Sequence, residues 1–340
     1  MSLATAILTG DVAELPSKRD EDWRWTDLRG LIRAVPPGSP RYEGALAAGP
    51  FEAAEELVVV NGHGPSRLHV LAGERKVVAL RFVSHATETA HLARFAVEVE
   101  AGGSLTLLES YEGQGSGYVA HAGLDIRLGE GARLERVVIA DDDADAVSVS
   151  SAEVTLSGEA VFEQTVLTGG AKRQRIETRV THPGHGAAVR MDGAYLLADK
   201  RHADITTVVV HDGVDGTTEQ LTKGVVRDQA RGIFQGRIVV SEGADRTDAR
   251  MGHHALILSE RAEVDAKPEL LIYADDVQCA HGNTVGALDE AAIFYARQRG
   301  IPDEQARAML TEAFVGEVID RIGNEGARDA ARAWAGERLR

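Results

Sequence analysis

The stretch FAVEVEAGGSLTLLE, residues 95–109, contains two short runs of alternating apolar and polar side chains joined by a pair of glycines. Alternation with a period of two is typical of a β-strand with one buried face, and the glycines favour a turn between two strands. The same texture appears in ELVVV (56–60), KVVALRFVS (76–84) and ITTVVV (205–210). No convincing amphipathic helix of ten or more residues interrupts it before about residue 285, which disfavours a doubly wound α/β domain.

Glycines recur through this region at a nearly constant step. They open apolar or alternating stretches at intervals of 28, 27, 28, 30 and 27 residues, at Gly103, Gly131, Gly158, Gly186, Gly216 and Gly243. A constant step between turns is typical of a β-solenoid in which each repeat is one coil. With 36 glycines in the chain, a near-regular set can also be selected by eye. We predict a parallel β-helix, with a β-sandwich or jelly roll as the alternative.

The two ends of the chain differ from this β-rich centre. Thr26 can cap a short helix in the first segment, and a cluster of prolines ends any helix begun there. Near the other end, Asp289 can cap a helix that runs to about Gln298. We expect three segments: an N-terminal helical region (1–54), a β-helix core (55–285) and a C-terminal helical domain (286–340).

The C-terminal segment carries a broad apolar stripe. Leu310, Phe314 and Val318 recur every four residues, which places them on one helix face, and Tyr295 lies on the preceding helix. A helical cap on the end of the solenoid uses one apolar side, so surplus apolar width can dock a partner. A cap that only covers the last coil explains the stripe equally well.

Composition limits the classes of function. No apolar run approaches the roughly 18 residues of a membrane span, and the N-terminus lacks the basic start of a secretory signal. Cys279 is the only cysteine, so an intrachain disulfide is excluded, in agreement with a reducing compartment. A formal net charge of -16 argues against nucleic acid and anionic membranes as partners. We expect a cytoplasmic protein.

Common catalytic motifs are missing from the sequence. It contains no GxxxxGK[ST], HExxH, GxSxG or CxxC, so nucleotide hydrolysis, zincin and esterase chemistry and a self-contained cysteine metal site lack their signatures. A carbohydrate-active β-helix enzyme would need paired carboxylates on one exposed face and usually a secretion signal. We therefore do not expect an enzyme.

Several other groups offer weak metal-binding candidates. His182 and His185 lie in THPGHG, where proline and glycine indicate first of all a turn. His253 and His254 are adjacent, so on a strand they point to opposite faces. The run DDDAD (141–145) offers carboxylates without EF-hand spacing, and we expect a solvated loop there.

The stretch DDVQCAHGNT (275–284) holds Cys279 and, two residues further on, His281. On a strand, residues i and i+2 share a face, so both side chains can reach one soft or borderline metal ion or one cluster edge. Two ligands do not close a four-coordinate site. The alternative is a buried free cysteine beside a histidine that is satisfied by the backbone, and the residues alone favour this alternative.

Residues 230–301 contain a chain of specific motifs in order and without gaps: TDA, AEVDAKPEL, ADDVQCAHGNTVG and LDEAAIFYARQRGI. This stretch resembles the C-terminal half of the SufB/SufD family of iron–sulfur cluster assembly proteins. It is more similar to the SufD members, because SufB proteins carry a glutamate/histidine sequence where this chain has CAHG. The stretch PSKRDEDWRWTDLRGL (16–31) resembles the SufD N-terminal signature. Because 340 residues is short for the family, we expect a trimmed N-terminal region.

The resemblance implies a right-handed parallel β-helix flanked by an N-terminal helical region and a C-terminal helical domain. It implies a scaffold subunit of the SUF system that pairs with SufB through the β-helices. It also implies docking of the ATPase SufC on the C-terminal helices, for which we select Tyr295, Leu310, Phe314 and Val318. ATP hydrolysis is then expected from SufC, and the isolated chain can form a homodimer.

The resemblance also assigns a role to the motif CAHG. His281 matches a SufD histidine thought to join a SufB cysteine at the heterodimer interface where a nascent cluster forms, and Cys279 matches a neighbouring cysteine of less certain role. We expect both residues to be buried until ATP-driven SufC dimerisation strains the interface. The cluster would be transient, and the isolated chain would bind none stably. The alternative is a purely structural subunit that stabilises SufB and SufC without ligating iron.

Overall fold

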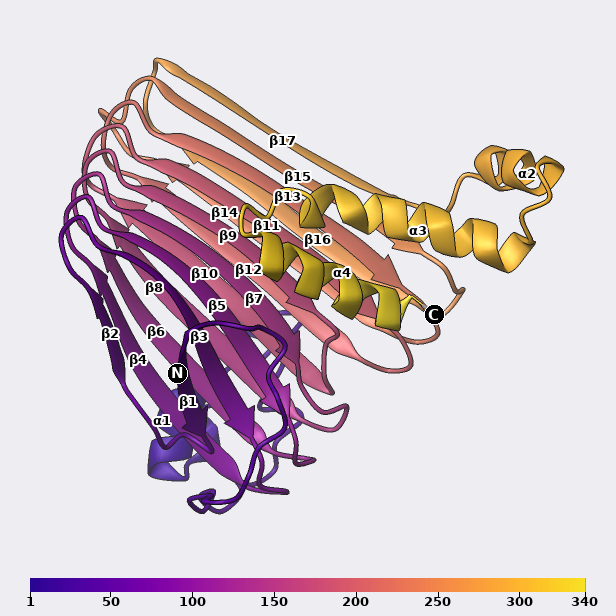
Figure 1. The fold of residues 1–340 in the computed structure, drawn as a ribbon, viewed down its shortest axis with the longest axis horizontal. Coiled ribbons are helices and arrows are strands. Elements are labelled where there is room, and N and C mark those ends of the chain that lie inside the picture. The colour runs from indigo at the N-terminus through magenta and orange to yellow at the C-terminus, as the bar shows by residue number, and fades with distance from the viewer. Residues whose placement is uncertain (340) are drawn as a thin grey trace.

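Seventeen strands wind into two parallel sheets within residues 1–339, the part of the chain that the computed structural model describes (Figure 1). Odd-numbered strands form a nine-stranded sheet and even-numbered strands form an eight-stranded sheet. Each strand runs parallel to the strands that it pairs with. Because the chain alternates between the two sheets, it is a parallel β-solenoid, as the sequence predicts.

The strands of the nine-stranded sheet are β1 (Glu55–Val60), β3 (Arg75–Ser84), β5 (Ser104–Gly113), β7 (Arg133–Asp141), β9 (Val161–Thr168), β11 (Ala188–Leu197), β13 (Thr217–Val226), β15 (Thr247–Ile257) and β17 (Val277–Gly286). Those of the eight-stranded sheet are β2 (Arg67–Val70), β4 (Ala90–Val99), β6 (Val119–Leu128), β8 (Val147–Leu156), β10 (Arg173–His182), β12 (His202–His211), β14 (Arg231–Val240) and β16 (Glu263–Ile272). From β3 onward, paired residues in neighbouring coils lie between 26 residues apart, as for Val147 and Arg173, and 32 apart, as for Arg231 and Glu263. These steps bracket the spacing of the glycines.

One corner of the solenoid is a column of residues in the left-handed backbone conformation. Its members recur once per coil: Gly73, Gly102, Gly131, Glu159, Gly186, Asp215 and Arg246. Gly131 donates its N–H to the carbonyl of Gly158 at 2.9 Å, and Glu159 donates to that of His185 at 2.8 Å. The glycine period therefore arises from a stacked turn, in which three coils use a side-chain-bearing residue instead of glycine.

The interior is mostly apolar, and it also holds buried polar groups, among them an ionic layer between the sheets. Arg136 of β7 donates two hydrogen bonds to Glu109 of β5, at 2.7 and 2.6 Å, and one to Gln164 of β9 at 2.5 Å. Thr178, from the opposite sheet, donates to the same Gln164 oxygen at 3.1 Å. Arg136 and Glu109 are 1% and 0% exposed, so each ion depends on its partner for solvation.

The first part of the N-terminal segment, residues 1–35, lies on the outer face of the eight-stranded sheet. Helix α1 (Leu3–Thr9) and two 3-10 turns (Val12–Glu14 and Glu21–Trp23) are its only regular elements within the described residues. Thr26 begins no helix, which corrects the prediction, because its hydroxyl donates instead to buried Asp204 at 2.5 Å. The Trp23 ring lies 4.5 Å from the guanidinium of Arg175, so the motif DEDWRWTD fixes the N-terminal segment to the sheet.

Three helices follow the last strand: α2 (Glu290–Gln298), α3 (Asp303–Ile319) and α4 (Glu325–Arg338). Asp289 caps α2 as predicted, by accepting a hydrogen bond from the N–H of Ala291. Helices α3 and α4 pack on the outer face of the nine-stranded sheet, while α2 projects away from the body (Figure 1). The helices therefore do not cover the last coil, which corrects the interpretation of the apolar stripe as an end cap. None of the helices among the described residues is long and apolar enough to cross a membrane.

The ionic layer makes a stability prediction. Glu109→Leu leaves the Arg136 charge buried without a partner and should lower the free energy of unfolding by about 3–5 kcal/mol, whereas adding Arg136→Met should restore most of the loss. Asp125→Ala is the control, because its pair with Arg127 at 3.2 Å is exposed and should contribute about 0–1 kcal/mol. Urea denaturation followed by circular dichroism measures all three. A double variant no more stable than Glu109→Leu would contradict the prediction.

The turn column predicts opposite effects in neighbouring coils. Gly131 has φ 63°, and a Cβ built there meets nothing within 4 Å, so Gly131→Val should cost about 1–2 kcal/mol through backbone strain alone. Glu159 has φ 57° one coil further on, so Glu159→Gly should relieve strain and cost nothing or stabilise slightly. Thermal unfolding of the two variants tests this, and a shift of the same sign in both would contradict it.

Candidate functional site

Strand β17 is the open end of the nine-stranded sheet. It pairs with β15 on one side, and no strand of the described residues pairs with its other side. β16 is the corresponding end of the eight-stranded sheet. The outward N–H and C=O groups of these two strands are a template for pairing with another chain.

The open end is also apolar. Large exposed side chains gather on and beside β16 and β17: Leu271, Ile272, Tyr273 and Val285. Tyr273 is 64% exposed and directly follows the apolar end of β16. The sequence signal was present in the run ELLIY (269–273), but it could not be distinguished from a core strand without knowing that this coil is the last one. An apolar surface next to unpaired strands is typical of a protein interface.

Cys279 and His281 lie on the same face of β17. They pair in register with Ala249 and Met251 of β15, both of which are buried. Cys279 is half-buried against this cluster, and burial raises the pKa of its thiol. His281 is exposed. In the single chain neither residue is fully buried, because no strand of the described residues pairs with the outer edge of β17. Their burial at an interface with a partner chain stays a prediction.

By themselves, Cys279 and His281 are too few to complete a metal site. A thiolate and an imidazole suit iron in a sulfur-rich site, which matches the chemistry of the donors present. Within residues 1–339 there is no group of three or more His, Cys, Asp or Glu side chains placed to hold a metal ion. A four-coordinate site at β17 would need further ligands from outside this chain.

His182 and His185, the weaker candidates for a metal site, do not lie together in the structure. His182 hydrogen-bonds through Nε2 to Nδ1 of His211, one coil further on, and both rings are buried. Burial lowers the pKa of both imidazoles, that of His211 to about 3, so the pair is neutral at physiological pH. His185 is exposed, 3.7 Å from Glu159. The motif THPGHG thus forms no metal pair.

The acidic run is not wholly a solvated loop, which corrects that prediction. Asp142 is buried, where its carboxylate accepts hydrogen bonds from the Tyr118 hydroxyl and the Gln174 amide, both at 2.7 Å. Burial nevertheless raises the pKa of Asp142. Its two partners come from coils on either side, which no local spacing reveals.

The apolar stripe of α3 is mostly used to pack on the solenoid. Val318 is fully buried, and Phe314 lies against the sheet with Lys223 4.4 Å from its ring. Leu310 packs between α3 and α2 beside Ile293. Of the four residues selected from the sequence, Tyr295 alone is fully exposed.

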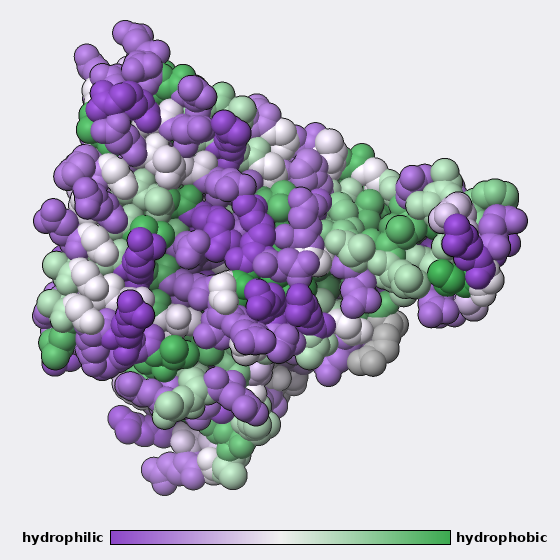
Figure 2. All heavy atoms as spheres, turned by 45° about the horizontal axis from the view of Figure 1, so that its top comes forward, coloured by the Kyte–Doolittle hydropathy of each residue, from purple (hydrophilic) through white to green (hydrophobic). Residues whose placement is uncertain are grey.

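The exposed apolar side chains of the helices gather instead on the projecting part. Phe294 and Tyr295 of α2 are 62% and 61% exposed, and Met309 of α3 is 50% exposed. Figure 2 shows apolar residues along this arm, which we define as residues 287–311. Phe294 was not selected from the sequence. It lies on the same helical turn as Tyr295, and the sequence pattern does not show which of the two is exposed.

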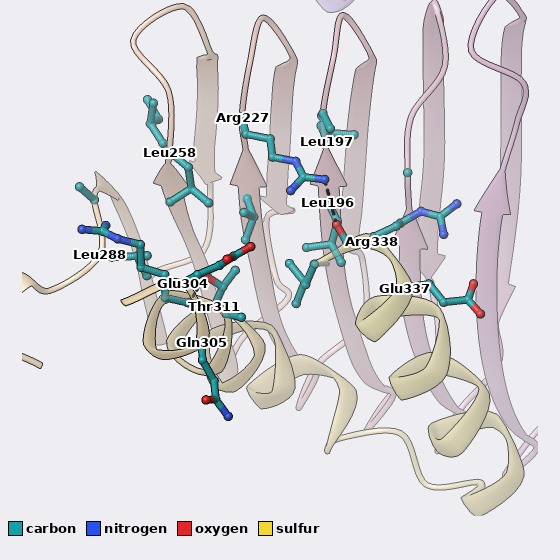
Figure 3. A pocket seen from close by; sticks show the side chains of 18 of the residues that line it. Leu196, Leu197, Arg227, Leu258, Leu288, Glu304, Gln305, Thr311, Glu337 and Arg338 are labelled. Carbon is teal, nitrogen blue, oxygen red and sulfur yellow. Dashed lines mark hydrogen bonds between the residues drawn. The ribbon is translucent and has the colours of Figure 1, made fainter. Parts of the chain in front are cut away.

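Ion pairs beyond the end of the arm fix α3 to the nine-stranded sheet. Near the end of α3, Lys223 pairs with Glu317 at 2.7 Å and Arg321 pairs with buried Asp192 at 3.1 Å. Burial raises the pKa of Asp192 to about 6, against the opposing effect of Arg321. Near the start of α3, a cavity of about 990 Å³ separates the helix from the ends of the strands, with Leu258 and Leu288 on its wall and Glu304 facing it (Figure 3).

Comparison with known proteins places this geometry in a family. Residues 82–314 match the family model described as "SUF system FeS cluster assembly, SufBD core domain". The iron–sulfur cluster assembly protein SufD of Escherichia coli is 29% identical over an alignment covering 96% of this chain and 89% of that protein. A SufBD family protein of Mycobacterium leprae is 27% identical, covering 94% of this chain and 89% of that protein. SufD of Bacillus subtilis is 35% identical over 37% of this chain and 29% of that protein.

The match confirms the resemblance to SufD. It also extends the resemblance through the middle of the chain, where the sequence motifs are absent and only the β-rich pattern had indicated it. The family model covers β4 to β17 and reaches into α3, so it includes the CAHG motif and the whole arm. The chain belongs to the SufBD family of SUF-system iron–sulfur cluster assembly proteins.

Proposed function

We propose that this chain is a SufD-type scaffold subunit whose open solenoid end pairs with a SufB-type chain. The observation that carries the proposal is the placement of Cys279 and His281 on a strand whose outer edge has no partner and which is flanked by exposed apolar side chains. A second solenoid end can satisfy the open backbone groups and bury Tyr273 at the same time. Without such a partner, two copies of this chain can pair through the same end.

At that interface the nascent cluster is cargo, held between two chains. His281 supplies an imidazole nitrogen, Cys279 can supply a thiolate, and the partner chain supplies the remaining ligands. No covalent catalysis by this chain is required, and the protein would act in the cytoplasm.

We assign the arm to the ATPase SufC. Its exposed apolar residues need a covering partner, and the cavity beneath α3 leaves room for the arm to shift while Arg321 holds the other end. ATP hydrolysis belongs to SufC, because this sequence has no phosphate-binding loop. Movement of the arm would pull on β11 and β13 through α3 and so change the neighbouring open end.

The alternative is a structural subunit that holds SufB and SufC but ligates no iron. The exposure of His281 favours this alternative, because no buried group among the described residues hydrogen-bonds to its ring and holds it in place. The two functions differ in what His281 does and agree on the interfaces.

The ligand role of His281 is tested by substitution in the SufB/SufC/SufD complex. His281→Ala should leave the complex assembled while cluster formation in vivo falls at least about 10-fold, because an open coordination position makes the cluster labile. Cys279→Ala should have a smaller effect. His254→Ala is the matched control, since this imidazole lies on the outer face of β15 beside Thr284. Wild-type cluster assembly by purified His281→Ala complex would establish the structural alternative.

Docking of SufC is tested on the arm. Phe294→Asp with Tyr295→Asp should abolish co-purification with SufC and leave the circular dichroism spectrum unchanged, because both side chains are exposed. Leu71→Asp is the control, since Leu71 is 55% exposed at the other end of the solenoid. Phe314→Asp would not separate docking from folding, because Phe314 packs on the sheet. Unchanged affinity of the folded double variant would place the docking surface elsewhere.

A further inference from the structure

A chain of hydrogen bonds runs through the interior to the open end of the solenoid. The Tyr195 hydroxyl lies 2.9 Å from Nε2 of His253, and Nδ1 of His253 lies 2.6 Å from Oδ1 of Asn283. These residues belong to β11, β15 and β17, so the chain crosses the last coils. Asn283 is exposed and lies on the same face of β17 as His281, two residues further on.

Two glycines leave space for the ring of Tyr195. A Cβ placed on Gly224 would lie 2.0 Å from the Tyr195 ring, and one on Gly232 would lie 2.3 Å from it. Because two glycines make room for the ring, the hydroxyl reaches past β13 to His253. His253 is itself held by parallel stacking on Phe234, with ring centroids 4.9 Å apart.

The protonation pattern follows from the partners. Burial lowers the pKa of His253 to about 4, so its ring is neutral and carries one N–H. The Tyr195 hydroxyl has no other hydrogen-bond partner among the described residues, so donation to Nε2 is the arrangement that leaves no buried donor unpaired. His253 then carries its proton on Nδ1 and donates to Oδ1 of Asn283. The amide nitrogen of Asn283 is left with two N–H groups on the exposed side.

We propose that Asn283 donates an amide N–H to the sulfide of the cluster held at His281, and that Tyr195 and His253 are positioning residues for this donor. The proposal rests on the proposed function. Cluster sulfides carry negative charge, and hydrogen bonds to them raise the reduction potential and slow ligand loss. The relay fixes which end of the amide faces the interface, since a rotated amide would place its oxygen, a lone-pair acceptor, against the sulfide.

The tautomer is tested first, in the isolated chain without any cluster. In the full-length protein labelled with ¹⁵N-histidine, long-range ¹H–¹⁵N correlation spectra at pH 7 should show His253 protonated on Nδ1. Tyr195→Phe removes the hydroxyl donor at nearly constant volume and should allow the Nε2-protonated form to appear. Protonation of His253 on Nε2 in the wild-type chain would overturn the proposal, whatever the chain does in its complex.

The donor is tested in the cluster-loaded SufB/SufC/SufD complex. Asn283→Leu should release iron to a chelator roughly 10-fold faster than wild type and shift the reduction potential to more negative values. His253→Gln should retain the wild-type values, because its amide can accept from Tyr195 and donate to Asn283, whereas His253→Phe should behave as Asn283→Leu. Thr284→Ala, on the other face of β17, is the control.

Two outcomes of this second test would overturn the proposal. One is an Asn283→Leu complex with wild-type release rate and potential. The other is a wild-type complex that forms no cluster, in which case the proposed function fails as well. The spectra of the isolated chain distinguish the two failures, because they report the relay without the cargo.

Discussion

The hydrogen bonding of each coil to the next is the constraint on which the rest of the structure depends. Every strand from β3 to β15 has a partner on both sides, and every turn in the left-handed column is tied to the turn of the next coil. Each coil offers the same backbone groups to the next coil. The last coil therefore exposes the strand edge and the apolar side chains that every earlier coil buries. The C-terminal helices do not resolve this, because they pack on the side of the nine-stranded sheet. The open end at β17 is thus a consequence of the fold as much as a feature of the site.

The same stacking explains why polar groups can be buried in the interior. Neighbouring coils place matched positions side by side, so Arg136 finds Glu109 one coil earlier and Gln164 one coil later. Arg136, Glu109 and Gln164 are satisfied by one another in the stack, which offsets the cost of their desolvation. Tyr195 uses the same device across two coils, with glycine between to make room. A registry of this kind opposes a slip of one coil against the next.

The sequence predicted the architecture because the repeat length of the solenoid depends on local features of the chain. Alternation within strands and glycines at turns both depend on neighbours in the chain, and they identified the solenoid and the helix that follows Asp289. What failed depended on contacts between coils. His182 was compared with His185 in the same turn, whereas its partner His211 lies 29 residues away. Applying the period to side chains would have found this pair and also His253 with Asn283, 30 residues apart. Contacts such as Thr26 with Asp204, 178 residues apart, follow from no repeat.

An incomplete pair of ligands at an open end is physically suited to a cargo that must leave. A closed set of four ligands within one chain would hold a cluster through its folding free energy, and release would require local unfolding. If Cys279 and His281 ligate the cluster as proposed, two ligands on an exposed strand would hold it only while a second surface is present, and the lifetime of the cargo would follow the lifetime of the interface. Arg321 anchors α3 on the sheet that ends in β17, so on the proposed function the projecting arm would be connected to the strand whose pairing would control that lifetime.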